Sequence, residues 1–146
     1  MTDTRLTRRD AIRLGLAAGL APYFAFAEDS SSMIKRPIRA SGETLPVIGL
    51  GTWQVFDVPG TPEEIALRRR IVLALVDRGG SLIDTSPMYD RSEKVIGDVI
   101  EAGIERSELF LATKVWTDGR AAGEEQMRRS FELMNTDVVD LMQVHN

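Results

Sequence analysis

The stretch SLIDTSPMYDRSEKVIG, residues 81–97, decides how the rest of the sequence is interpreted. It begins with a short apolar strand that ends in Asp84, and a Ser-Pro turn then leads to Tyr89. A helix is predicted to begin at Ser92, and Gly97 is small enough to let this helix lie close to a sheet. A carboxylate at the end of a strand, followed five positions later by a tyrosine, is arranged as in a functional site.

Strands and helices alternate on both sides of this stretch. The predicted elements are a hairpin over 33–44 with its turn at Ser41-Gly42, strands over 45–53, 81–84, 109–114 and 138–144, and helices over 61–78, 92–102 and 120–134. This alternation indicates parallel strands joined by helical crossovers, and therefore an α/β fold. Right-handed crossovers bring the C-terminal ends of all parallel strands to one edge of the sheet.

The first predicted helix has an unusually complete start. Thr61 can cap it, Pro62 suits the first helical position, and Glu64 can close a capping box. Gly79 ends the helix because glycine accepts the left-handed conformation found past helix ends. The residues expected to face the core are, helix by helix, Ile65, Val72, Leu75 and Val76; Val95, Ile96, Val99 and Ile100; and Met127, Phe131 and Met134.

Four side chains are expected to meet at the C-terminal edge of the sheet. Asp84, Lys114 and His145 each end a predicted strand, and Tyr89 lies on the loop above them. Taken singly, each has a structural explanation: a turn cap, a solvated residue after a strand, a histidine at the edge of the core, and a packing aromatic. Their convergence at the edge where such folds bind ligands favours catalysis instead.

These four groups suit acid–base chemistry on a carbonyl. An unperturbed tyrosine titrates at about pH 10, so it exchanges protons poorly at neutral pH unless a neighbouring ammonium favours its phenolate. A carboxylate paired with the ammonium holds it in place, and an imidazole can hydrogen-bond and orient a carbonyl oxygen. Because no side chain supplies hydride, a nicotinamide cofactor is implied.

Composition and charge exclude several classes of function. The 146 residues have room for one ordinary domain, and 43% apolar with 27% charged residues is typical of a soluble globular protein. A net charge of −4 without a long basic run argues against nucleic acid as a partner. With no cysteine and one histidine, disulfides and cysteine nucleophiles are excluded, and no metal site is expected.

Residues 1–27 have the pattern of an export signal. The pair Arg8-Arg9 precedes an apolar run of small residues that ends in Ala25-Phe26-Ala27, an A-x-A cleavage pattern. The arginine pair resembles a twin-arginine signal. An uncleaved membrane anchor and a short core helix are the alternatives, but the apolar run is shorter than the roughly 20 residues of a spanning helix, and Pro22 interrupts it.

Removal of this signal would release an acidic chain into the periplasm. Residues 28–34 then form a polar linker and residues 35–146 the folded domain. No stable membrane insertion is expected once the signal is removed.

Residues 35–146 resemble the N-terminal half of an aldo-keto reductase. The matching pieces are 45–54 (LPVIGLGTWQ), Asp84-Thr85-Ser86-x-x-Tyr89 with Ser92-Glu93 and Ile96-Gly97, 111–114 (LATK) and 140–146 (DLMQVHN). The resemblance implies a (β/α)8 fold of the TIM-barrel type, of which the chain holds the first four β/α units and an N-terminal hairpin, a half barrel. It also implies NADP(H)-dependent reduction of an aldehyde or ketone.

The resemblance assigns a role to each of the four residues at the sheet edge. Tyr89 would be the general acid, and Lys114 and Asp84 would tune it. His145 would orient the carbonyl of the substrate.

The resemblance also implies where the cofactor and the substrate lie. Gly51 and Thr52, together with Asp84, would line the nicotinamide end of the pocket. Trp53 would lie next to the substrate. Trp53, Phe56 and Trp116 suggest an apolar, aromatic-walled mouth.

Two departures from the family pattern matter. Asp90 stands where the family usually has glycine, although aspartate tolerates the left-handed conformation better than most residues. A barrel of this type needs roughly 250 residues, and most residues that hold the cofactor come from its second half. The chain alone is therefore expected to be inactive, and to self-associate through exposed strand edges or misfold.

Other functions stay open. One is a non-catalytic half barrel that assembles with a partner, and another is a regulatory or binding module on the same fold. A Rossmann dinucleotide fingerprint fits poorly, because Gln54 replaces the third glycine after Gly49-x-Gly51 and the helix begins only at Thr61.

Overall fold

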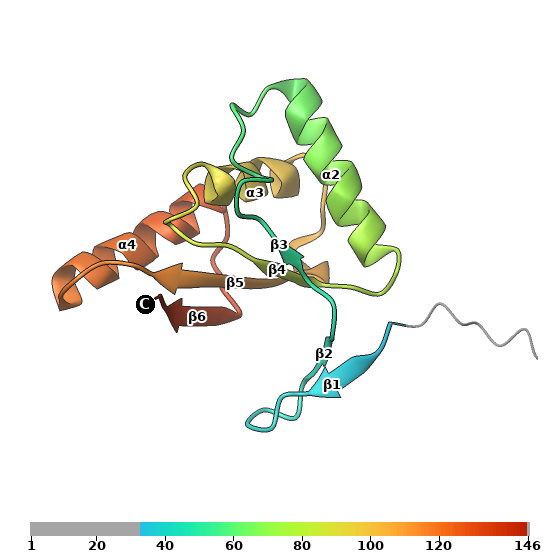
Figure 1. Ribbon diagram of the computed structural model, residues 1–146, viewed down its shortest axis with the longest axis horizontal. Helices are drawn as coiled ribbons and strands as arrows, with labels where there is room; N and C mark the ends of the chain where they lie inside the picture. The colour runs from blue at the N-terminus through green and yellow to red at the C-terminus, as the bar shows by residue number, and fades with distance from the viewer. Residues whose placement is uncertain (1–32, 146) are drawn as a thin grey trace, which may run out of the picture. The chain divides into compact units, whose positions relative to one another are not determined.

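The computed structural model describes residues 33–145 (Figure 1), and the structural statements below concern these residues. The predicted export signal over 1–27 and most of the linker over 28–34 lie outside them. Within the described part, no helix is long and apolar enough to cross a membrane.

A four-stranded parallel sheet lies at the centre of the fold. Its strands, in spatial order, are β3 (Leu50–Gly51), β4 (Leu82–Asp84), β5 (Phe110–Val115) and β6 (Leu141–Val144). The spatial order equals the chain order, as the predicted β/α alternation requires. Within residues 33–145 the sheet is open, with β3 and β6 at its edges, and it does not close into a barrel.

Three helices connect these strands and lie on the same side of the sheet (Figure 1). They are α2 (Pro62–Val76), α3 (Ser92–Glu101) and α4 (Arg120–Leu133), and a short 3-10 turn, η1 (Arg106–Glu108), precedes β5. The predicted capping box of α2 is confirmed: Thr61 N–H donates to Glu64 Oε2 at 3.0 Å, and Glu64 N–H donates to Thr61 Oγ1 at 3.4 Å. Gly79, at φ 80°, follows the helix as expected.

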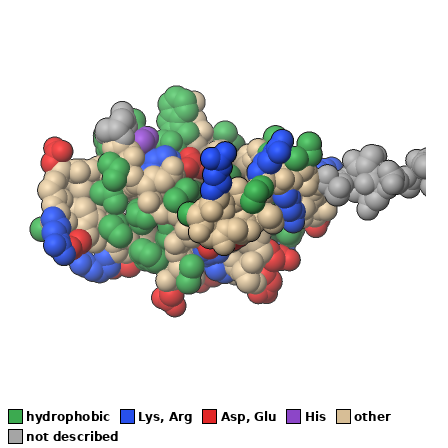
Figure 2. Space-filling view, turned by 90° about the horizontal axis from the view of Figure 1, so that it is seen from below, with side chains coloured by type: hydrophobic (Ala, Val, Ile, Leu, Met, Phe, Trp, Pro, Cys, Tyr) green, Lys and Arg blue, Asp and Glu red, His purple; other side chains and the backbone are tan. Residues whose placement is uncertain are grey.

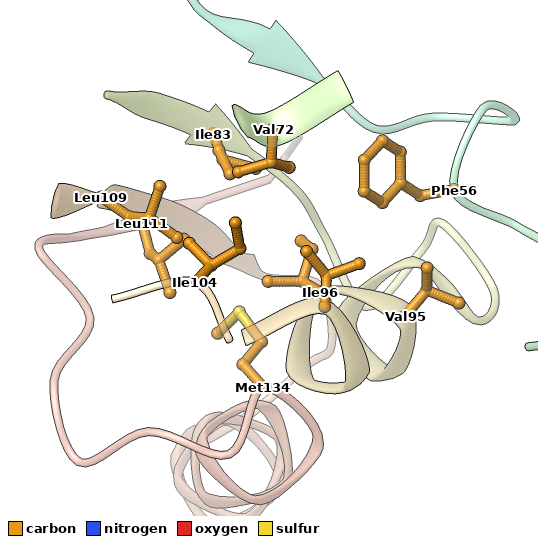
Figure 3. Packing of buried hydrophobic residues seen from close by; sticks show 10 residues of the cluster. Phe56, Val72, Ile83, Val95, Ile96, Ile104, Leu109, Leu111 and Met134 are labelled. Carbon is orange, nitrogen blue, oxygen red and sulfur yellow. The ribbon is translucent and has the colours of Figure 1, made fainter. Parts of the chain in front are cut away.

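The hydrophobic core lies between the helices and the sheet (Figure 3). Its buried members are Phe56, Val72, Ile83, Val95, Ile96, Val99, Ile104, Leu109, Leu111 and Met134. Ile65, Leu75, Val76 and Ile100 pack against it, which confirms the predicted inner faces of α2 and α3. The predicted inner face of α4 is only partly buried, since Met127 and Phe131 are half-buried.

The hairpin is confirmed but extends further than expected. Its strands are β1 (Lys35–Pro37) and β2 (Thr44–Pro46), which pair antiparallel. The predicted nine-residue buried strand over 45–53 is therefore wrong. Its first two residues belong to the hairpin, Val47 and Ile48 are exposed, and β3 is two residues long. An apolar run records burial tendency, but not the point at which the chain passes from one sheet to another.

Gly97 permits a close approach, but to a different neighbour than predicted. A Cβ at this position would lie 2.2 Å from the carbonyl oxygen of Leu133, at the end of α4. The expectation that Gly97 brings its helix close to the sheet is therefore wrong, and the contact that needs glycine joins α3 to α4.

Candidate active site

The C-terminal edge of the parallel sheet holds an ion pair between neighbouring strands. Lys114 of β5 donates from Nζ to Asp84 Oδ2 of β4 and to the carbonyl oxygen of Thr85, both at 2.7 Å. Lys114 is almost fully buried, whereas the side chain of Asp84 is partly open to solvent. The ammonium is therefore held by two strong hydrogen bonds at a fixed place on the sheet edge.

Tyr89 lies on the turn that follows β4, next to this ammonium. Its N–H donates to the carbonyl of Ser86 at 2.9 Å, and Lys114 Nζ lies 5.0 Å from the centre of its ring. This is the distance of a cation–π contact. Among residues 33–145 the Tyr89 hydroxyl makes no hydrogen bond with Lys114. The ammonium thus faces the ring of the phenol rather than its oxygen.

His145 follows β6 directly and completes the group. Its N–H donates to the carbonyl of Val115 at 2.9 Å, and its ring meets the ring of Tyr89 edge-on, at 6.0 Å and 88°. Its Nδ1 lies 3.2 Å from the hydroxyl oxygen of Ser86. The structure therefore brings together the four side chains that the sequence placed at one edge, and their catalytic roles stay predictions.

Gly51 and Thr52, two of the three residues predicted to line the cofactor, differ in their surroundings. Gly51 pairs with Asp84, and a Cβ added to it would meet no atom within 4 Å. Thr52 is buried, and both its N–H and its hydroxyl donate to the carbonyl of Asp84, at 3.1 and 3.0 Å. Gly51 therefore offers open space at the sheet edge, while Thr52 braces the backbone that carries Asp84.

Both predicted substrate-facing tryptophans are exposed, Trp53 by 60% and Trp116 by 46%. Trp116 and His145 line a hollow of about 520 Å³ together with Thr117, Asp118 and Val144. Trp53 does not line this hollow. The expectation that Phe56 helps to form the mouth is wrong, because its side chain is fully buried in the hydrophobic core. Figure 2, which views the molecule from below, shows hydrophobic side chains gathered over part of that face. Leu141 and Val144 of β6 are exposed to solvent.

Sequence reasoning missed two residues that contact this site. Gln143 pairs with Lys114 across the sheet, and its Nε2 donates to Asp84 Oδ1 at 3.3 Å. Gln143 lies two positions before His145, and side chains two positions apart in a strand point to the same face. This spacing could have placed both residues on one face of the sheet. Ser86 belongs to the quoted motif, but its contact with His145 spans 59 positions and leaves no local signal.

A buried carboxyl group lies behind the ion pair. Glu93 of α3 is 2% exposed and accepts a hydrogen bond from Thr113 Oγ1 of β5 at 2.6 Å. Burial raises the pKa of Glu93 above its ordinary value of 4.5, although the hydroxyls of Thr113 and Ser130 and the charge of Lys114 act in the opposite direction. Within residues 33–145 no cluster of histidine and acidic side chains is suited to hold a metal ion.

Replacing Glu93 with glutamine is expected to change how stability depends on pH. A raised pKa means that the folded chain holds the Glu93 proton more tightly than the unfolded chain does. Protonation of Glu93 therefore stabilises the fold. This contribution is fully present below the pKa of the unfolded chain, near 4.5, and is lost as pH rises through the pKa of the folded chain. Relative to Glu93→Gln, the unsubstituted chain should therefore gain stability on acidification, measured by urea unfolding at neutral and mildly acidic pH. The exposed Glu101→Gln on the same helix is the control, and parallel curves for the unsubstituted chain and Glu93→Gln would contradict the expectation.

Comparison with known proteins gives consistent sequence matches. Residues 47–146 match the model of the "Aldo/keto reductase family". An aldo-keto reductase from Mycolicibacterium vanbaalenii is 34% identical over 118 residues, which cover 80% of this chain and 39% of that protein. Aldo-keto reductase YhdN from Bacillus subtilis is 35% identical over 112 residues, which cover 67% of this chain and 33% of YhdN. The chain thus spans less than two fifths of the length of these relatives.

Solved structures agree with these matches. An aldo-keto reductase from Klebsiella pneumoniae in complex with NADPH superimposes with a TM-score of 0.63 at 30% identity, over 77% of this chain and 40% of that one. A second structure of an aldo/keto reductase from the same organism, with NADP and acetate, gives the same TM-score at 29% identity. These neighbours imply an α/β fold of the TIM-barrel type, of which the open parallel sheet is a part.

Proposed function

The chain belongs to the aldo/keto reductase family, and we propose that its residues 47–145 carry the acid–base part of an NADP(H)-dependent site that reduces an aldehyde or ketone. The observation that carries this proposal is the position of Lys114 Nζ, which lies 2.7 Å from Asp84 Oδ2 and 5.0 Å from the centre of the Tyr89 ring. A phenol beside a fixed ammonium is the arrangement that carbonyl protonation needs. The NADPH and NADP held by two structural neighbours support the choice of cofactor.

The residues present fit a nicotinamide cofactor at the sheet edge. The open space over Gly51 leaves room for a flat ring beside Asp84. Gly51, Thr52 and Asp84 would hold that end of the cofactor, Thr52 through the backbone it braces. Bound NADPH supplies the hydride.

The protein's own contribution is to move a proton and to orient the carbonyl. The Tyr89 hydroxyl donates its proton to the carbonyl oxygen of the substrate. The Lys114 ammonium stabilises the phenolate that remains, and Asp84 keeps the ammonium in place. His145 hydrogen-bonds the same carbonyl oxygen and orients it.

The exposed tryptophans and the location extend this proposal. Trp53 and Trp116 provide apolar walls for the organic part of the substrate, since both indole rings are open to solvent. Export to the periplasm through a twin-arginine signal over residues 1–27 rests on the sequence pattern alone. It is tested by following the fate of a folded reporter protein attached to those residues.

We further propose that the 146-residue polypeptide, taken by itself, does not catalyse reduction of a carbonyl substrate. Its sheet is open between residues 33 and 145, and the matched segments are 39% and 33% of the lengths of the two curated relatives described above. Unpaired strand edges also favour pairing with a second copy or misfolding.

The assay for both proposals is the loss of NADPH absorbance in the presence of an aromatic aldehyde. The 146-residue polypeptide is expected to give no turnover. A hybrid barrel, in which residues 47–145 replace the matching segment of the Klebsiella pneumoniae enzyme, is expected to turn over. Clear turnover by the isolated polypeptide would contradict the second proposal, and a folded hybrid that binds NADPH without turnover would contradict the first.

A further inference from the structure

Ser86 is a buried serine whose hydroxyl has two neighbours. It is 0% exposed and lies two positions after Asp84, at the start of the turn that carries Tyr89. The backbone N–H of Met88 donates to its Oγ at 3.2 Å, and Nδ1 of His145 lies 3.2 Å from the same oxygen. A serine hydroxyl has one hydrogen to donate and two lone pairs to accept.

These contacts determine which way the hydrogen bond to the histidine runs. The Met88 N–H can only donate, so it occupies one lone pair of the Ser86 oxygen. If Nδ1–H of His145 also donated, the buried Ser86 hydrogen would need another acceptor, and among residues 33–145 the Ser86 hydroxyl has no hydrogen-bond partner besides Met88 and His145. A buried donor without a partner costs free energy, so the favoured arrangement has Ser86 donating to Nδ1.

We propose that Ser86 is a positioning residue that holds neutral His145 as the tautomer with its proton on Nε2. A neutral imidazole carries one proton, so a ring that accepts at Nδ1 must donate at Nε2. The use of this tautomer rests on the proposed function, in which Nε2–H of His145 donates a hydrogen bond to the carbonyl oxygen of the substrate. The opposite tautomer would direct a lone pair at that oxygen and repel it.

A structural role alone would make a different prediction. Serine hydroxyls commonly accept hydrogen bonds from the backbone two residues on, and the Met88 contact has this form. If this contact is all that Ser86 provides, its removal weakens the turn but leaves the tautomers of His145 in the same ratio. The two roles therefore predict different tautomer ratios for the His145 imidazole after removal of the Ser86 hydroxyl.

The chain allows this state to be observed directly, because it contains one histidine. In the ¹⁵N-labelled 146-residue polypeptide at alkaline pH, long-range ¹H–¹⁵N correlation should give one donor-type Nε2 signal and one acceptor-type Nδ1 signal, far apart. In Ser86→Ala the two signals should move toward each other as both tautomers become populated. Ser130→Ala, which removes another buried serine hydroxyl away from His145, should leave them unchanged.

A protonated Nδ1 in the unsubstituted chain, or unchanged signals in Ser86→Ala, would overturn the proposal. A second measurement uses the hybrid barrel and does not depend on the isolated polypeptide being well folded. There Ser86→Ala should lower kcat by up to about tenfold, the worth of one hydrogen bond, with NADPH binding unchanged; an unchanged kcat would also overturn the proposal. A hybrid that keeps Ser86 and gives the donor-type Nε2 and acceptor-type Nδ1 signals of His145, but reduces no aldehyde, would refute the reductase function. The tautomer assignment would then still hold.

Discussion

Replacing Tyr89 with phenylalanine is expected to lower kcat of the hybrid barrel by about 10²- to 10⁴-fold, the range of a general acid–base contribution. Phenylalanine keeps the ring that lies 5.0 Å from Lys114 Nζ and meets His145 edge-on, and it removes the hydroxyl alone. The packing of the turn should therefore be preserved, while the proton donor is lost. The measurement is the rate of NADPH oxidation at saturating aldehyde.

Two controls accompany this substitution. NADPH binding, followed by fluorescence, should be unchanged, because Tyr89 acts on the substrate oxygen. Ser130→Ala removes a buried hydroxyl outside the sheet edge and should leave kcat unchanged. A Tyr89→Phe variant that retains most of its turnover would show that another group protonates the carbonyl.

Replacing Gly97 with alanine is expected to destabilise the fold by about 3 kcal/mol, the upper part of the range for overpacking. The new Cβ would lie 2.2 Å from the carbonyl oxygen of Leu133 and 3.1 Å from the backbone of Met134. Both neighbours are backbone atoms, so no side chain can rotate away. Helices α3 and α4 must therefore separate, and buried Met134 loses contacts with the core.

Gly123 of α4 provides a matched control, because it is also a buried helical glycine. A Cβ there would lie 3.5 Å from Val115 Cγ1, an ordinary contact. Gly123→Ala should therefore stabilise the fold by up to about 1 kcal/mol through helix propensity. Urea unfolding of both variants gives the comparison, and equal stability of Gly97→Ala and Gly123→Ala would contradict the structure at this contact.

Local signals in the sequence predicted the three helices well. The capping box at Thr61 and Glu64 involves residues three apart, and hydrogen bonds between neighbours in sequence depend little on the rest of the fold. The alternation of strands and helices also suffices to place Asp84, Lys114 and His145 at one edge, because parallel topology brings strand ends together.

Contacts between distant segments were harder to predict. Gly97 signalled a close approach, yet its partner Leu133 follows from how α3 packs on α4, which no spacing in the sequence encodes. The apolar run 45–53 reads as one strand because hydrophobicity alone does not reveal that Val47 and Ile48 are exposed in the connection between β2 and β3. The hydrogen bond between Ser86 and His145 depends on the register of β6 against β5.

The central claim is that Tyr89 and Lys114 act as one proton-donating unit at the edge of the sheet. A double-mutant cycle in the hybrid barrel tests it, with kcat measured for Tyr89→Phe, Lys114→Met and the double variant. If the ammonium acts through the phenol, the double variant should be no slower than Tyr89→Phe alone. A double variant whose loss equals the product of the two single losses would contradict the claim, because the two groups would then contribute independently.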